Sequence, residues 1–192
     1  MTRIEIRLHG LGGQGIISAG RLIGEAASLH ERSEAVMTED YSPYITGGWS
    51  RADLVISDEP IDYPLVTKPD ILVAMSQDGF DENWKSTVPN ATIIVEKGIV
   101  KTCQVEGRKL FAVPALATAE GLGKRVVANI VILGFLTAKT GVVSREALER
   151  AILTRYAKAA DLNRRAFQKG VELASQSVEV SQKEEEASYL RI

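Results

Sequence analysis

The stretch Ile4-Glu-Ile-Arg-Leu-His-Gly-Leu-Gly-Gly-Gln-Gly15 decides the fold class of this 192-residue chain. Its first five residues alternate between apolar and charged side chains, which predicts a β-strand with one buried face. The next seven include four glycines, and beyond them apolar side chains recur every three or four residues as far as Ala27, which predicts a helix. A strand, a glycine turn and a helix form the first half of a βαβ unit.

The rest of the chain continues this alternation, which predicts the α/β fold class. Short apolar runs bounded by Pro, Asp, Asn or Gly predict further strands, and because these runs are continuous the strands should be covered on both faces. Ser76 and Ser144 stand where helix N-caps are expected. The predicted strands are 3–8, 52–57, 71–75, 92–96 and 110–113; the predicted helices begin after the glycine turn, Ser76, Pro114, Lys124 and Ser144, and a last one spans Leu162 to Leu173.

The length indicates one domain and a short extension. The domain is predicted over residues 1–175 and an acidic C-terminal tail over 176–192. Three consecutive acids and little apolar periodicity leave two interpretations of the tail: a mobile segment, or an arm that becomes ordered only against a partner.

Composition and charge exclude several classes of protein. With 23 Lys and Arg against 25 Asp and Glu, the net charge of −2 provides no basic field, so no nucleic-acid partner is predicted. A single cysteine, Cys103, provides neither a disulfide nor the four thiolates of an iron–sulfur cluster, and no metal site is predicted. The N-terminus has no apolar signal region, and the longest apolar run, 126–136, is too short to span a bilayer. The prediction is a cytoplasmic protein without a membrane partner.

The glycine turn matches the pattern GxGxxG through Gly10, Gly12 and Gly15. This pattern lets the N-terminus of a helix accept a pyrophosphate. A dinucleotide site also requires an acid about 20 residues further on, and Glu34 lies near that distance in a segment with a weak strand pattern. Gly13 and Gln14 are unusual in dinucleotide fingerprints. Two interpretations stay open: a dinucleotide site, or a tight turn that needs glycine only for its geometry.

A second glycine-rich element spans residues 40–51. It combines three aromatic residues, a proline, Gly47-Gly48 and Arg51, the residue types that dominate interfaces. The two glycines permit a close backbone approach, and Arg51 could hold a phosphate or a carboxylate. The alternative is an ordered loop in which Trp49 is buried and Arg51 forms a surface ion pair.

Evidence for catalysis by this chain is thin, and no catalytic residue is predicted. His9 and His30 are the only histidines, and no neighbouring Cys, Ser or acid repeats a catalytic triad or a metal-ligand spacing. His9 could line a site beside the glycine turn or be a structural histidine. Cys103 is interpreted as structural because no adjacent His or helix start would lower its pKa.

Five motifs in order identify a resemblance. They are the Gly10–Gly15 turn, the loop from Tyr41 to Ala52, the run that begins at Asp53, the apolar helix around Asn129, and Asn163-x-x-Ala-Phe-x-x-Gly170. Together they resemble the gamma subunit of 2-oxoacid:ferredoxin (acceptor) oxidoreductases over about residues 3–175. The resemblance implies a three-layer α/β/α, Rossmann-like domain with a mostly parallel sheet. It also implies a subunit of an enzyme that oxidatively decarboxylates pyruvate, 2-oxoglutarate or a branched-chain 2-oxoacid, with coenzyme A as acyl acceptor and ferredoxin as electron acceptor.

The resemblance further implies which centres lie elsewhere. Thiamine diphosphate and Mg²⁺ belong to the alpha and beta subunits and the iron–sulfur clusters commonly to a delta subunit, so this chain alone should be inactive, and ferredoxin is an indirect partner. Coenzyme A is the ligand that this chain could contact. The alternative function is a stand-alone dinucleotide-binding protein, and a third is an assembly scaffold. The candidate cofactor-binding residues are Gly10, Gly12, Gly13, Gln14, Gly15, Gly47, Gly48 and Arg51.

One segment departs from the family pattern. The family loop usually reads close to Tyr-Gly-Pro-Glu-x-Arg-Gly-Gly, whereas here it is Tyr41-Ser-Pro-Tyr-Ile-Thr-Gly-Gly48. Both charged residues before the glycines are replaced, so their role in relatives does not transfer to this chain. Arg51, close behind the glycines, is the candidate substitute.

Overall fold

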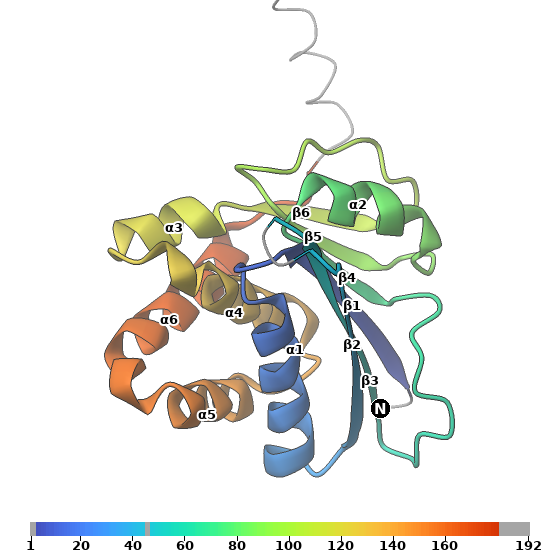
Figure 1. Cartoon of the computed structure of the whole chain (residues 1–192), viewed down its shortest axis with the longest axis horizontal. Coiled ribbons are helices and arrows are strands. Elements are labelled where there is room, and N and C mark those ends of the chain that lie inside the picture. The colour runs from blue at the N-terminus through green and yellow to red at the C-terminus, as the bar shows by residue number, and fades with distance from the viewer. Residues whose placement is uncertain (1–2, 45–46, 181–192) are drawn as a thin grey trace, which may run out of the picture.

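The computed structural model describes residues 3–44 and 47–180 of the chain. Six strands form one sheet in the order β2-β3-β1-β4-β5-β6, with helices packed around it (Figure 1). The strands are β1 (Ile4–Leu11), β2 (Glu34–Tyr41), β3 (Trp49–Ser57), β4 (Ile71–Ala74), β5 (Thr92–Glu96) and β6 (Lys109–Val113). The helices are α1 (Ile16–Glu25), α2 (Gln77–Asn83), α3 (Ala115–Gly121), α4 (Ala128–Thr140), α5 (Arg145–Arg155) and α6 (Ala160–Gln176).

The sheet is mostly parallel, as predicted. Strands β1, β4, β5 and β6 pair in parallel, whereas β3 pairs antiparallel with both of its neighbours, β1 and β2. Among the described strands, β3 is therefore the one that runs against the other five. The carboxyl ends of those five strands meet at one edge of the sheet, where α/β proteins bind their ligands.

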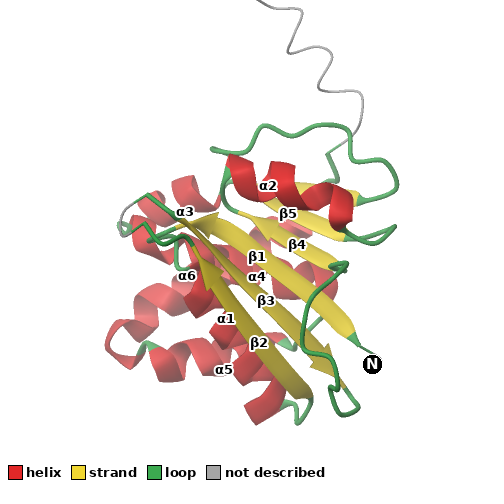
Figure 2. Cartoon of the chain, turned by 45° about the vertical axis from the view of Figure 1, so that its right-hand side comes forward, coloured by secondary structure: helices red, strands yellow, loops and turns green. Residues whose placement is uncertain are grey.

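Helices cover the two faces of the sheet unequally. On one face, here called the inner face, α1, α3, α4, α5 and α6 bury a large apolar core that includes Ile6, Leu54 and Val73. On the opposite, outer face, α2 packs over β4 and β5 through Phe80 in a second, smaller core (Figure 2). The predicted three-layer α/β/α architecture is confirmed, and α2 is the one helix of the outer layer among the described residues.

The closest packing of the inner layer lies where α4 crosses α6. A β-carbon placed on Gly134 would overlap the carbonyl oxygen of Phe167, and one on Gly170 would overlap that of Val131. Both contacts are with backbone, which cannot rotate aside as a side chain can. The crossing therefore requires glycine at both positions.

Local signals in the sequence place most of the elements. Ser76 and Ser144 cap α2 and α5, because each hydroxyl accepts a hydrogen bond from the backbone N–H three residues later, at 3.2 Å in both cases. The strand β2 was not predicted. It is an edge strand in which most side chains are partly or fully exposed, so its sequence lacks the continuous apolar run of a central strand.

The end of the described chain returns to the sheet. After α6 ends at Gln176, the N–H of Val180 donates to the carbonyl oxygen of Leu110 on β6 at 2.9 Å, and the Val180 side chain packs against the smaller core. The rest of the predicted acidic tail, residues 181–192, lies outside the described residues. No helix in the part of the chain that the structure describes is long and apolar enough to cross a membrane.

Candidate functional site

The glycine turn links the carboxyl end of β1 to the first turn of α1. Gly15, the N-cap of α1, has φ +75°, a left-handed conformation that favours glycine, and a β-carbon there would also overlap the Asn129 amide. The Asn129 amide donates to the Gly15 carbonyl oxygen at 3.2 Å. The turn is thus held between α1 and the start of α4.

Gln14 fixes the turn through its own side chain. Its Oε1 accepts a hydrogen bond from the Leu11 N–H at 2.7 Å, and its Nε2 donates to the Met75 carbonyl oxygen, at the end of β4, at 2.9 Å. Both ends of the amide are therefore committed to backbone. Gln14 ties together the carboxyl ends of β1 and β4.

The two glycine-rich elements found in the sequence are in contact. The N–H of Gly12 donates to the carbonyl oxygen of Gly48 at 2.7 Å, and the N–H of Ser42 donates to the Trp49 carbonyl oxygen at 2.9 Å across the base of the loop. A β-carbon on Gly48 would approach the Ser42 side chain to 2.7 Å. The close backbone approach expected of Gly48 is therefore present, and it joins the loop to the glycine turn.

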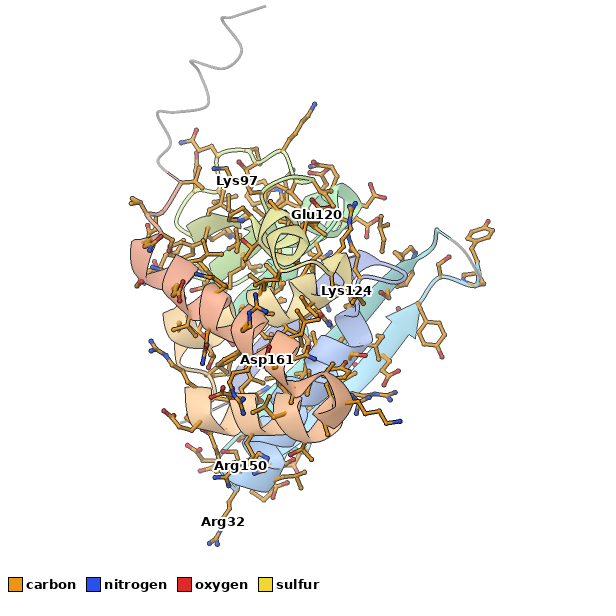
Figure 3. The ribbon with its side chains drawn as sticks, turned by 90° about the vertical axis from the view of Figure 1, so that its left-hand side faces the viewer. Arg32, Lys97, Glu120, Lys124, Arg150 and Asp161 are labelled. Carbon is orange, nitrogen blue, oxygen red and sulfur yellow. The ribbon has the colours of Figure 1, made fainter. Side chains whose placement is uncertain are left out.

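A cavity of about 270 Å³ opens beside the turn, at the carboxyl edge of the sheet. Its far side is formed by α3 and by the connection from α3 to α4, on which Figure 3 labels Glu120 and Lys124. Its polar contacts come from the turn and from Arg125, and the remaining contacts are apolar. The lining residues are Gly13, Gln14, Met75, Leu116, Arg125, Val126 and Ala128.

The electrostatics of this cavity favour an anion. Helix α1, which begins directly after the turn, has no acidic residue in its first turn and no side-chain cap among the described residues, so neither offsets the partial positive charge at its N-terminus. Arg125 adds a full positive charge, and its ion pair with Glu120, at 3.5 Å, is largely exposed and therefore weak. Because phosphate groups bind at such helix termini, the cavity suits a phosphorylated ligand.

A buried carboxylate supports the α3 side of the cavity. Glu96, at the end of β5, accepts backbone hydrogen bonds from Gly98 and Leu116, both at 3.1 Å, and so caps the start of α3. Burial raises the pKa of Glu96 above its ordinary value, and the backbone hydrogen bonds oppose this shift.

Arg51 lies away from the cavity. It is on the outer face of β3, where its guanidinium bonds Asp40 at 2.8 Å and lies 5.9 Å from the centre of the Trp49 ring. The expected ion pair of Arg51 is thus present, but Trp49 is 37% exposed rather than buried. The structure does not bring Arg51 together with the glycine turn's cavity.

His9 is buried beside the same outer face, at the end of a polar network. Arg7 donates to both carboxylate oxygens of Asp53, at 2.8 and 2.6 Å, and to the Asn83 side chain, whose amide in turn donates to Nδ1 of His9 at 2.9 Å. Nε2 of His9 is buried with no hydrogen-bond partner among the described residues. Burial lowers the pKa of His9 below its ordinary value; the charges of Arg51 and Arg7 lower it further, while those of Glu82 and Asp53 raise it.

Glu34 is in the wrong place for a dinucleotide. It is the first residue of β2 and pairs with Ser57, at the amino edge of the sheet. The strand β1 starts at that edge and reaches the glycine turn about 20 Å away. Strand β3 also separates β2 from β1, so Glu34 is not at the end of a strand beside the turn, where a dinucleotide fingerprint places its acid.

A family model described as pyruvate ferredoxin/flavodoxin oxidoreductase matches residues 5–173. This chain belongs to that family. The 2-oxoglutarate synthase subunit KorC of Methanocaldococcus jannaschii is 43% identical over 91% of this chain and 95% of its own. The crystal structure of a keto/oxoacid ferredoxin oxidoreductase gamma subunit from Geobacter sulfurreducens has a TM-score of 0.83 and 38% identity, and it covers 92% of this chain and 98% of its own.

Longer family members contain this unit as one part of a larger chain. The ketoisovalerate oxidoreductase subunit VorA of Methanothermobacter thermautotrophicus is 32% identical over 92% of this chain, which spans 37% of VorA. A 2-oxoglutarate:ferredoxin oxidoreductase from Magnetococcus marinus, solved with 2-oxoglutarate, coenzyme A and succinyl-CoA bound, shares the fold with a TM-score of 0.85 at 23% identity. It covers 94% of this chain, which spans 32% of that one.

Sequence reasoning found part of this family member's candidate site. It identified the glycine turn and its neighbour Gly48, but not Arg125, Leu116 or Met75, because these residues come from separate parts of the chain that only the tertiary fold brings together. The one signal for Arg125 was its place just before the apolar helix α4. Among the described residues no three His, Cys, Asp or Glu side chains lie close enough to hold a metal ion, and Cys103 is exposed.

Proposed function

We propose that this chain is the gamma-type subunit of a cytoplasmic 2-oxoacid:ferredoxin oxidoreductase that converts a 2-oxoacid and coenzyme A to an acyl-CoA. Its partners are the alpha, beta and delta subunits, and ferredoxin acts through them. Relatives named as 2-oxoglutarate synthase subunits, such as the one 43% identical to this chain, make 2-oxoglutarate the first substrate to test.

The role proposed for this subunit is to bind part of coenzyme A. The observation that carries it is the cavity beside the glycine turn, which Arg125 lines and next to which α1 begins; both would favour an anionic group there. At about 270 Å³ the cavity is smaller than pockets that enclose a drug-sized ligand, so it suits a phosphorylated part of coenzyme A and leaves the rest to a partner. The coenzyme A named in the Magnetococcus marinus structure supports this choice of ligand.

The centres of the reaction are assigned to the partner subunits. Thiamine diphosphate with Mg²⁺ supplies the decarboxylation chemistry and iron–sulfur clusters carry the electrons. The single cysteine and the lack of a three-ligand group among the described residues do not fit a cluster or a metal in this chain. The chain's own residues therefore bind and orient: α1 and Arg125 hold an anionic group, while Gln14 and Gly15 keep the turn in place.

An acidic substitution at Arg125 tests this role. In the complex of co-expressed subunits, Arg125→Glu should raise KM for coenzyme A about tenfold or more and leave kcat within about twofold, because a charge-assisted contact to the bound ligand is lost. Lys158→Glu makes the same charge change in the short turn before α6, at a residue that does not line the cavity, and is the control. An unchanged KM for coenzyme A would contradict the proposed binding role.

The isolated chain distinguishes this function from a stand-alone dinucleotide-binding protein. We expect it to oxidise no 2-oxoacid alone and to bind NAD, NADP and FAD only weakly in calorimetric titrations. The position of Glu34 at the far edge of the sheet supports this expectation. Tight binding of NAD or FAD by the lone chain would favour the alternative.

A further inference from the structure

The outer face of the sheet is exposed along β2 and at the first residues of β3, next to the glycine turn. Among the described residues no helix covers it, because α2 lies over β4 and β5 (Figure 2). The strand register places on this face Leu11 beside Trp49 and, across β3, Arg51 beside Asp40. We call this surface the outer patch; its residues are Leu11, Val36, Thr38, Asp40, Trp49 and Arg51.

The chemistry of the outer patch is that of a protein interface. Leu11 and Trp49 are each 37% exposed, and the Arg51 guanidinium lies over the Trp49 ring. Tryptophan and arginine are enriched among the side chains that carry binding energy. The Arg51–Asp40 pair, with its Asp40 side chain half exposed, contributes little to stability, so a partner can exchange it for contacts of its own.

A buried, incomplete polar network lies directly behind the patch. The His9 ring contacts the Trp49 ring edge to face, with centroids 5.6 Å apart. Nδ1 of His9 accepts from Asn83, but its buried Nε2 has no partner within the described chain. Native proteins leave few buried polar groups unpaired. The network of the lone chain is therefore incomplete at the point where the patch's large aromatic residue sits.

Longer relatives indicate what kind of partner is available to cover this face. In VorA the unit equivalent to this chain occupies 37% of the polypeptide, so it is covalently joined to the rest. Where the two parts are separate chains, the same association has to be held by a contact surface. The inner face is buried under five helices, and the β6 edge is occupied by Val180, so neither offers an exposed sheet surface.

We infer that the outer patch docks the subunit that corresponds to the remaining part of VorA. This inference rests on the proposed function. Trp49 would be the central apolar anchor, with Leu11 beside it, and Arg51 would pair with a carboxylate of that subunit in place of Asp40.

The test co-expresses this chain with that subunit, which carries an affinity tag, and measures how much of this chain is retained and with what Kd. Trp49→Ala/Arg51→Glu should weaken the Kd about tenfold or more. Leu29→Ala/Arg164→Glu removes an exposed apolar residue in the turn that follows α1 and reverses an exposed arginine on α6, both outside the patch, and should keep the Kd within about twofold. Circular dichroism checks that both variants are folded.

A second variant covers the case in which loss of Trp49 unfolds the chain. Thr38→Arg places a large charged side chain on the outer face of the edge strand β2, where Thr38 is only partly buried, and should weaken docking by a similar factor.

If the folded patch variants bind as tightly as the wild type while the complex is active, the inference is wrong and the proposed function stands. If the wild-type chain binds no partner subunit, the proposed function fails, and the inference with it. If the wild-type chain forms a homodimer and only the patch substitutions dissociate it, the patch binds a second copy of this chain and the inference is overturned.

Discussion

The protonation of His9 is set by its burial and by the charged groups around it. Its Nδ1 accepts from Asn83, so Nε2 carries the proton and lies buried without a partner among the described residues. Burial lowers the pKa of His9, and the nearby positive charges of Arg51 and Arg7 act in the same direction. The folded protein therefore holds His9 neutral at a pH where an unfolded chain would protonate it.

This histidine should make the stability of the protein depend on pH. Below the ordinary His pKa of about 6.5, the unfolded state binds a proton at this histidine that the folded state does not bind. The free energy of unfolding therefore falls as the pH drops, by at most about 1.4 kcal/mol per pH unit. His9→Gln should remove this part of the dependence. Urea unfolding of both proteins between pH 5 and 8 measures it, and identical pH profiles would contradict the assignment.

Gln14 should matter for stability as well as for the shape of the turn. Gln14→Ala leaves the Leu11 N–H and the buried Met75 carbonyl oxygen without their partner, so we expect a loss of about 1–3 kcal/mol in the free energy of unfolding. The exposed Gln104→Ala is the matched control and should change little. A neutral effect of Gln14→Ala in denaturant titrations would mean that water replaces the amide at no cost.

At the scale of elements, the crossing of α4 and α6 is the most demanding contact. Gly170→Ala pushes a methyl group into the backbone of α4 at Val131 and Phe135, and overpacking of this kind costs about 1–3 kcal/mol or more. The thermal midpoint measures it. Gly121→Ala, at the end of α3 with open space around it in the described structure, should be neutral or stabilise by up to about 1 kcal/mol. Equal effects of the two substitutions would contradict the close crossing.

The sequence predicts elements well where the local signal is strong. The caps at Ser76 and Ser144 and the glycine turn before α1 all stand where expected, because each depends on residues within one turn of the chain. Local signals of this kind do not predict the strand β2 or the position of Arg125 in the cavity. Edge-strand burial and the approach of α4 to the turn are set by tertiary packing, which leaves little pattern in a single sequence.

At the scale of the whole molecule, the two edges of the sheet differ. The edge at β6 is met by the segment after α6, through the hydrogen bond from Val180 to Leu110, whereas no described strand pairs with the outer edge of β2. An uncovered strand edge is a template for pairing with another chain. The acidic residues Glu34, Glu39 and Asp40 along β2 disfavour such pairing by charge.

Shortening the chain should reveal how much the segment after α6, which contacts β6, contributes to stability. A chain that ends after Gln176 loses the Val180 hydrogen bond and its apolar contact, and should be less stable than a chain that ends after Val180 by about 1–2 kcal/mol. Guanidinium unfolding compares the two. Equal midpoints would show that this segment adds nothing to the sheet.

The paired glycines of α4 and α6 also have a mechanical consequence. With backbone touching backbone at Gly134 and Gly170, neither helix can slide or roll against the other without a collision. We therefore expect the two helices to move together as one unit. Because Ala128, the first residue of α4, lines the cavity beside the glycine turn, we expect a displacement of α6 to move that wall of the cavity.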